Sequence, residues 1–263
     1  MTWRWPIPRR TRLTTRNVRT PEDVVRHFDS LALHYREAHG CAGKLLSYRL
    51  GIIRRFLGGA QRGTLLEIGC GTAIHLLALA AEFGRAIGTD VSPEMVNAAR
   101  RHAHGSPWSD RISIRVDPAE ELATIEDSSI DVVLCVGALE HMLERDRILR
   151  QVHRVLRPRG MFIGLTPNGG YCWYRHVAPI LGIDSRHLST DRFLTADELE
   201  ELLSGAALEI VARQHWRFVP QGDLPGGWGP MLRVLDWCGE RAGIGYLRGG
   251  IAVAAVRPDG STR

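Results

Sequence analysis

Long apolar runs are missing from this sequence. Its longest stretches without Asp, Glu, Lys or Arg, residues 68–81 and 160–174, are too short and too rich in glycine to cross a hydrocarbon layer. We therefore expect no integral membrane association. The N-terminus also lacks the apolar segment of a secretory signal, so we expect a cytoplasmic protein.

Cysteine is scarce and shows no pairing pattern. The five cysteines are odd in number and none form a C-x-x-C pair, which argues against a disulfide framework and against a zinc module. His102 and His104 resemble a metal-binding pair only superficially, because no third ligand lies nearby in the sequence. The sequence predicts no metal site.

Acidic residues are absent from residues 1–20, which carry six arginines. Residues 21–263 hold the other 28 of the 34 basic residues and all 29 acidic ones, so their charges nearly cancel. The formal charge of +5 therefore comes from the N-terminal segment. We interpret residues 1–20 as a basic, disordered tail. A nearly neutral body requires no basic face for nucleic acid. We expect a small-molecule substrate and a monomer or homodimer.

The order of the predicted elements indicates an α/β fold. A helix begins at Thr20-Pro21-Glu22-Asp23, with threonine as N-cap and proline in the first turn, and Gly40 is a plausible end. A second helix covers residues 44–57. We then predict strands at 64–68, 86–89, 111–116, 130–136 and 161–166, and helices at 73–83, 92–101 and 143–156. Such alternation favours a Rossmann-like, doubly wound, mostly parallel sheet.

The alternation breaks after Pro167. Residues 168–194 show no clear period, a helix with a Thr195–Glu198 capping box follows at 195–203, and strands at 208–216 and 251–256 bring the sheet to seven. Residues 217–249 are rich in glycine and proline around an amphipathic stretch at 231–241. We predict one domain over 21–258, with leading lid helices at 21–60, insertions at 168–194 and 217–249, and a frayed tail at 259–263.

A glycine pair follows the first predicted strand. Gly69 and Gly71 allow a tight turn and a close approach of the backbone to a ligand, and Asp90 ends the next strand, where a carboxylate can accept from both hydroxyls of a ribose. A generic glycine turn is the alternative. A dinucleotide site needs a third glycine where Ile74 stands, and Glu67 would repel a pyrophosphate but suits a cationic ligand.

These residues give the sequence a close resemblance to the class I S-adenosylmethionine-dependent methyltransferases of the methyltransferase domain 11 type. The resemblance extends to residues 90–95, to 131–141 and to 155–160. It implies S-adenosyl-L-methionine as cofactor, with Gly69 and Gly71 at its methionyl part and Asp90 at its ribose. The residues that it implies at the cofactor are Tyr35, Glu67, Gly69, Gly71, Asp90, Val91, Met95, Asp117, Ala119, Val136 and Gly137. Pro118 separates Asp117 from Ala119, which leaves open which of the two meets the adenine.

His141, at the end of a predicted strand, is the candidate general base, and Glu140 is a second candidate. A histidine bonded to the backbone at a helix start is an equal alternative. Aromatic residues of the two insertions are candidates for the acceptor site, although they could instead pack locally, and Tyr35 could pack in the core. These acceptor-site candidates are Tyr171, Trp173, Tyr174 and Trp228.

The sequence therefore predicts methyl transfer to an oxygen, nitrogen or carbon of an apolar or aromatic small molecule, such as a secondary metabolite or lipid-like compound. Two alternatives stay open: an enzyme of the cyclase or decarboxylase type that uses the same cofactor site differently, and a cofactor-binding protein without turnover.

Overall fold

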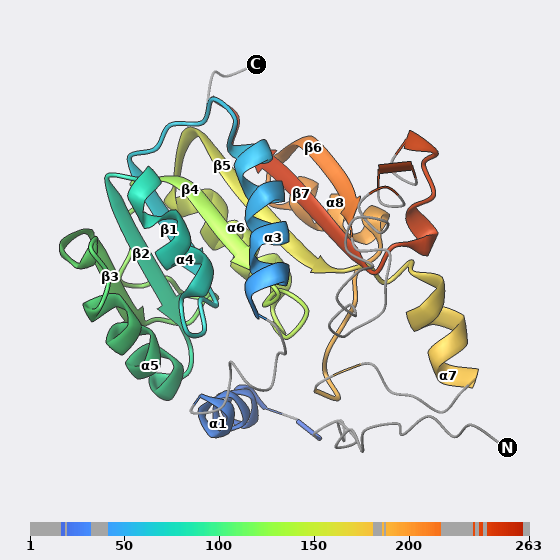
Figure 1. The fold of residues 1–263 in the computed structure, drawn as a ribbon, viewed down its shortest axis with the longest axis horizontal. Helices are drawn as coiled ribbons and strands as arrows, with labels where there is room; N and C mark the ends of the chain where they lie inside the picture. Colours follow the sequence, from blue (N-terminus) through green and yellow to red (C-terminus); the bar gives the residue numbers. More distant parts are fainter. Residues whose placement is uncertain are drawn as a thin grey trace, which may run out of the picture.

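The computed structural model describes residues 17, 18, 20–32, 42–180, 186, 188–216, 234, 237, 238 and 241–259. These residues contain a seven-stranded sheet with the order β3-β2-β1-β4-β5-β7-β6 (Figure 1). The strands are β1 (Thr64–Ile68), β2 (Arg85–Asp90), β3 (Ile112–Val116), β4 (Ile130–Val136), β5 (Leu156–Pro167), β6 (Glu209–Trp216) and β7 (Gly250–Val256). Only β7 is antiparallel to its neighbours, so the predicted doubly wound, mostly parallel sheet is confirmed.

Helices cover both faces of this sheet. The described helices are α1 (Pro21–Leu31), α3 (Ala42–Leu57), α4 (Ile74–Leu79), α5 (Pro93–His104), α6 (Arg145–Val155), α7 (Ala178–Ile180) and α8 (Ala196–Gly205). Short turns of tighter or wider helix lie at Ala80–Glu82, Ser109–Arg111, Trp173–Val177 and Gly245–Leu247. None of these helices is long and apolar enough to cross a membrane.

Strand β4 shows why its sequence is apolar at nearly every position. Val132 belongs to the core under α3 and α4, whereas the adjacent Val133 belongs to the core under α6 and α8. Both side chains are almost completely buried, because successive residues of a strand point to opposite faces and both faces are covered.

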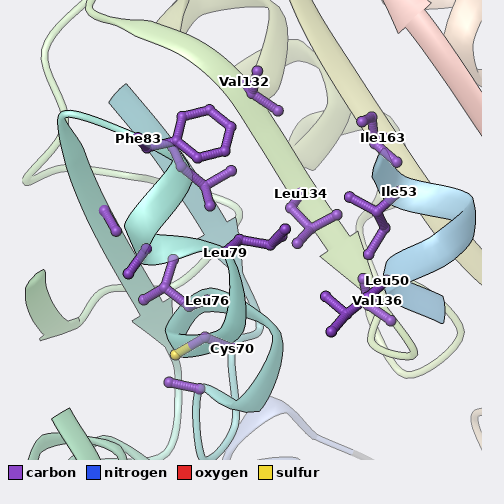
Figure 2. Close-up of a cluster of buried hydrophobic side chains, with 14 of the residues drawn as sticks. Leu50, Ile53, Cys70, Leu76, Leu79, Phe83, Val132, Leu134, Val136 and Ile163 are labelled. Atoms are coloured by element: carbon purple, nitrogen blue, oxygen red, sulfur yellow. The ribbon is translucent and has the colours of Figure 1, made fainter. Parts of the chain in front are cut away.

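The first core lies between the sheet and α3, α4 and α5. Figure 2 shows Leu50 and Ile53 of α3 next to Val136 and Ile163, with Leu76 and Leu79 of α4 beside them. This packing fixes α4, and with it the loop that joins β1 to α4.

The second core lies on the opposite face, under α6 and α8. Helix α6 contributes Ile148, Leu149 and Val152, which pack with Phe162 of β5 and Leu203 of α8. The loop between β3 and β4 is anchored in the same core by Leu122 and Ile125.

Several element boundaries differ from the sequence prediction. The α-helix predicted over 73–83 stops at Leu79 and continues as one 3-10 turn, α5 extends past Arg101 to His104, and β5 begins at Leu156. The predicted N-cap Thr20 of α1 and the predicted capping box of α8 are confirmed, and Asp23 also completes a capping box at α1. Gly40, most of the insertion at 217–249 and residues 1–16 of the predicted tail lie outside the described residues.

One residue of the predicted N-terminal tail is packed against the body. Val18 is 3% exposed and clusters with Val24 and Leu188. Its N–H donates to Ser189 Oγ over 2.9 Å, and its carbonyl accepts from the same hydroxyl over 3.0 Å. Contact with the body therefore begins upstream of residue 21.

Candidate active site

The candidate site residues gather at the carboxyl ends of the parallel strands. Chain order reverses between β1 and β4, since the chain leaves β1 toward β2 on one side and returns through β4 on the other. Ligands of open α/β sheets bind at such a switch point. Helix α1 lies beyond this edge of the sheet (Figure 1).

Glycine is required in the loop after β1. Gly69 has φ of +60° and Gly71 has φ of +52°, a left-handed region that glycine enters without strain. A Cβ on Gly69 would lie 2.6 Å from Ala138 Cβ, so this position also has no room for a side chain. The sequence placed this turn correctly.

Asp90 connects the end of β2 to that glycine loop. Its Oδ2 accepts from the Gly71 N–H over 2.8 Å, and its Oδ1 accepts from the Ser92 N–H over 2.9 Å. Burial raises the pKa of Asp90, although the two backbone hydrogen bonds oppose the rise. Each carboxylate oxygen keeps a lone pair, so the two acceptors fit the vicinal hydroxyls of a ribose, which donate.

Glu67 has internal partners for both carboxylate oxygens. Oε2 accepts from the Leu76 N–H over 2.9 Å, and Oε1 lies 3.2 Å from His75 Nδ1. The carboxylate is 1% exposed and therefore supports the first turn of α4. A cationic ligand at the glycine loop would be attracted by Glu67 as by a buried negative charge.

Asp117 and Ala119 follow β3, next to Asp90. Both carboxylate oxygens of Asp117 accept hydrogen bonds from Ala123 and Thr124. Ala119 is 7% exposed, and its N–H has no acceptor among the residues that the structure describes. Val91 and Met95 lie at the start of α5, Met95 fully buried.

Gly137 follows β4 and lies close to two charged side chains. It has φ of +64°, and a Cβ placed on it would be 3.7 Å from an Arg49 guanidinium nitrogen and 3.9 Å from Glu140 Oε1. Glu140 is buried, and its Oε2 accepts from Thr166 Oγ1 over 3.1 Å. The guanidinium of Arg49 also lies over the Trp216 ring, 5.6 Å from its centroid.

His141 is paired with a carboxylate that the sequence did not reveal. Its Nδ1 lies 2.6 Å from Oδ1 of Asp191, whose Oδ2 accepts from the Leu188 N–H. The ring of Phe28 in α1 contacts the imidazole edge to face at 5.4 Å. Burial lowers the pKa of His141, but the Asp191 hydrogen bond and the nearby Glu140 and Asp191 charges outweigh it, and the net pKa is raised.

The aromatic candidates of the segment after β5 pack mainly on one another. Tyr171 is 4% exposed and meets Tyr174 edge to face at 5.1 Å, and Tyr174 lies 4.9 Å from Phe193. Trp173 is half-buried within the π-helical turn. The candidates Tyr35 and Trp228 lie outside the described residues.

Helix α1 contacts both parts of this site. Asp29 accepts hydrogen bonds from Ser92 Oγ and from the Glu94 N–H at the start of α5, near Asp90. Phe28, one residue earlier, reaches His141. No motif in the sequence signals these contacts, because the partners are more than 60 residues apart.

The sheet order, the glycine loop and the carboxylate at the end of β2 define a class I S-adenosylmethionine-dependent methyltransferase. Residues 66–164 match the family described as "Methyltransferase domain", and with the relatives named below this match supports an S-adenosylmethionine-dependent methyltransferase. Its cofactor is S-adenosyl-L-methionine. The loop at Gly69 and Gly71 and the acceptor oxygens of Asp90 fit this cofactor.

Two curated relatives act in quinone biosynthesis by name. The chain is 28% identical over 200 residues to the "Ubiquinone biosynthesis O-methyltransferase" of Idiomarina loihiensis, which covers 73% of this chain and 81% of that protein. It is 26% identical over 225 residues to a "Ubiquinone/menaquinone biosynthesis C-methyltransferase" of Geotalea uraniireducens, covering 78% and 93%.

A solved structure shares the fold. The geranyl diphosphate C-methyltransferase of Streptomyces coelicolor A3(2), in complex with S-adenosyl-L-homocysteine, superimposes with a TM-score of 0.64 at 16% identity. The match covers 90% of this chain and 98% of that one. At this identity the likeness supports the fold alone.

Proposed function

We propose that this methyltransferase acts on a hydroxylated aromatic small molecule of the quinone-precursor type, with the phenolic oxygen as the methylated atom. The observation that carries the proposal is the His141–Asp191 pair at the carboxyl end of β4. Methyl transfer to a phenol is faster when the hydroxyl loses its proton, and a histidine oriented by a carboxylate is suited to remove it. The O-methyltransferase name of one relative agrees with this choice.

In this proposal Asp90 holds the ribose, and the backbone of Gly69 and Gly71 lies along the methionyl part. Val91 and Met95 border the adenine, and Val136 and Gly137 lie near the reacting centre. When bound, S-adenosylmethionine supplies a methyl group that is already activated by its sulfonium charge. The protein then contributes alignment and the exclusion of water.

Each member of the catalytic pair has a separate task. Asp191 accepts a hydrogen bond from Nδ1, which fixes the imidazole orientation, and we assign Nε2 as the nitrogen that takes the acceptor proton. Glu140 adds a buried negative charge that favours the protonated imidazole formed in that step. We assign His141 as the base and Glu140 as a charge that supports it.

The acceptor would lie beside Gly137. Arg49 is near enough to this position to attract an anionic phenolate or carboxylate, and Trp216 and Tyr48 extend an aromatic surface behind it. Arg49 thus suits an acceptor that combines an aromatic ring with a negative group. Trp173 and Trp228 remain proposed contacts of the same acceptor.

The test is product analysis with a panel of acceptors. The enzyme is incubated with isotopically labelled S-adenosylmethionine and with catechols, hydroxybenzoates, aliphatic amines and tRNA. We expect phenols to gain the mass of one methylene group, with equimolar S-adenosylhomocysteine. His141→Ala should slow turnover on the order of a hundredfold, whereas His104→Ala, at an exposed histidine of α5, should not.

Other products would overturn the proposal. Methylation restricted to amines or to tRNA would exclude a phenolic acceptor. A rearranged or decarboxylated product formed without consumption of the cofactor would point to the cyclase or decarboxylase type of enzyme. Full activity of the His141→Ala enzyme on a phenol would remove His141 from catalysis.

A further inference from the structure

The loop between β3 and β4 is held by Asp117 at its start and by Arg154 of helix α6. It begins at the ligand edge of the sheet, where the Asp117 N–H donates to the Asp90 carbonyl over 3.1 Å. It ends at β4 on the opposite edge. Ala119, Leu122 and Ile125 point into the second core, whereas Ala123 and Thr124 are exposed.

Asp117 holds the amide groups of the loop. Its carboxylate, 2% exposed, accepts from the Ala123 N–H over 3.0 Å, from the Thr124 N–H over 2.8 Å and from Thr124 Oγ1 over 2.7 Å. The side chain is thus turned back into its own loop. Bonds of this kind to a carboxylate are stronger than neutral ones.

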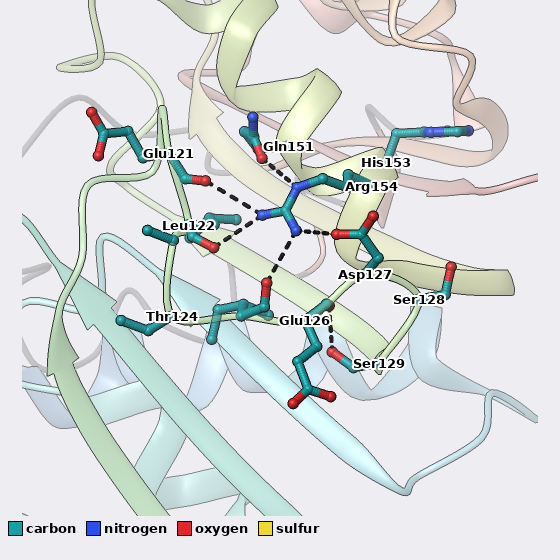
Figure 3. Close-up of polar contacts among 12 residues, drawn as sticks. Glu121, Leu122, Thr124, Glu126, Asp127, Ser128, Ser129, Gln151, His153 and Arg154 are labelled. Carbon is teal, nitrogen blue, oxygen red and sulfur yellow. Dashed lines mark hydrogen bonds and ion pairs between the residues drawn. The ribbon is translucent and has the colours of Figure 1, made fainter.

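Arg154 holds the carbonyl groups of the same turn. From the last turn of α6, its guanidinium donates to the carbonyls of Glu121, Leu122 and Ile125 over 3.3, 2.9 and 3.1 Å (Figure 3). It also contacts the Asp127 carboxylate, and its Nε donates to Gln151 Oε1 over 2.6 Å.

The turn needs these two side chains because its own backbone geometry is unfavourable. Leu122 has φ of +42° and is fully buried, a conformation that costs a residue with a Cβ free energy. Only the surrounding contacts can keep it there. Loss of the Arg154 fork would free the carbonyls on both sides of Leu122.

We propose that Arg154 is a positioning residue for cofactor recognition. Together with Asp117 it sets the loop so that the backbone of Pro118 and Ala119 forms the edge that reads the adenine base. Arg154 itself touches no cofactor atom. The inference rests on the placement of adenine in the proposed function, and it assigns the adenine edge to Ala119 rather than to the carboxylate of Asp117.

The preference of this edge for one base over another follows from the Ala119 N–H, which has no acceptor among the residues that the structure describes. Adenine N1 accepts a hydrogen bond, whereas N1 of hypoxanthine carries a proton and cannot. A correctly placed Ala119 N–H therefore favours adenine over hypoxanthine, and a displaced one does not.

The experiment measures dissociation constants of S-adenosyl-L-homocysteine and S-inosyl-L-homocysteine by calorimetry. For Arg154→Met we expect S-adenosylhomocysteine to bind about tenfold more weakly, and the inosyl compound to change by no more than about threefold. Arg147→Met is the matched control on the same helix, since Arg147 is exposed and, among the described residues, its side chain hydrogen-bonds Glu144 alone. It should leave both constants unchanged.

A purely structural role of Arg154 predicts a different result. Equal weakening for both ligands, or no weakening for either, would overturn the proposal. If Arg154→Met fails to fold, Arg154→Lys and Asp117→Asn are compared in the same way, and each must reduce the preference for the adenosyl ligand. The measurement needs no acceptor, so its outcome is independent of whether phenols are methylated.

Discussion

Asp191 changes what His141 can do at a given pH. Burial lowers the pKa of an imidazole, but here the hydrogen bond that His141 donates to Asp191 and the charge of Glu140 raise it above the ordinary value of 6.5. A base with a raised pKa binds the acceptor proton more strongly, and it is protonated up to a higher pH. The rate should therefore rise with pH through the pKa of His141.

Replacing Asp191 by asparagine should lower the pKa of His141. We expect the acidic limb of kcat/KM for the acceptor to move to lower pH in Asp191→Asn, and the rate on the plateau to fall about tenfold or more, because the tautomer is no longer fixed. The measurement is the pH profile of both enzymes. Asp197→Asn, at an exposed position of α8, is the control, and an unshifted limb in Asp191→Asn would contradict the role given to the pair.

The same pair predicts the sign of a stability change. Because the folded pKa of His141 is raised, protonation stabilises the folded state below pH 6.5. This stabilisation is lost as the pH rises through the folded pKa. Asp191→Asn should therefore cost more stability on the acidic side of that range than on the alkaline side.

Single residues divide into those that a local pattern reveals and those that it cannot. Gly69, Gly71 and Asp90 were predictable, because one strand-turn-helix unit contains the glycines and the next strand ends in the carboxylate. Asp191 was missed since it lies 50 residues from His141 and follows no periodic element. The use of Asp117 within its own loop was also hidden, because its partners depend on the turn at Leu122.

Helix α1 shows how one element can join separate parts of a site. Its residues Phe28 and Asp29 contact the base and the start of α5, and the chain just before it, at Val18, contacts the loop that carries Asp191. Removal of the contact between Val18 and Ser189 should disturb the loop that carries Asp191. The predicted N-cap threonine and the following proline located the start of α1, but no sequence signal showed what the helix would cover.

Two truncations separate the tail from this contact. Deleting residues 1–16 leaves Val18 and its hydrogen bonds with Ser189 in place, so their contribution to the free energy of unfolding should be kept. Deleting residues 1–19 should lower it by about 1–2 kcal/mol, because the burial of Val18 is lost. Urea unfolding measures both. A comparable loss from the shorter deletion would show that residues 1–16 also stabilise the body.

At the scale of the whole molecule, one sheet divides two cores, and β1, β2, β4, β5 and β7 contribute buried residues to both. Burial on both faces is why a doubly wound, mostly parallel sheet was predictable from the apolar runs and from the alternation of strands and helices. The segment at 168–194 was not predictable in the same way, because it lacks a repeating pattern and its described residues pack by individual contacts such as that of Tyr174 with Phe193.

Phe162 tests the dependence of the fold on the second core. It is fully buried in β5, and its ring lies over Gly164, where a Cβ would be 3.0 Å away. Phe162→Ala should lower the free energy of unfolding by about 3–5 kcal/mol. Val211→Ala, at a half-exposed position of β6, should change it by less than about 0.5 kcal/mol. Similar losses of unfolding free energy in both variants, measured by urea denaturation, would contradict the dependence of the fold on the second core.

The position of the antiparallel strand β7 determines when the sheet can be completed during protein synthesis. Residues 250–256 lie between β5 and β6, and β6 has no other neighbour in the sheet. During synthesis, the first six strands can emerge from the ribosome while β6 still lacks any strand to pair with. The sheet can be completed only after residue 256 has been translated and threaded between strands made earlier. Until then the edges of β5 and β6 that will pair with β7 are unpaired in the nascent chain. Such edges can pair with strands of other chains.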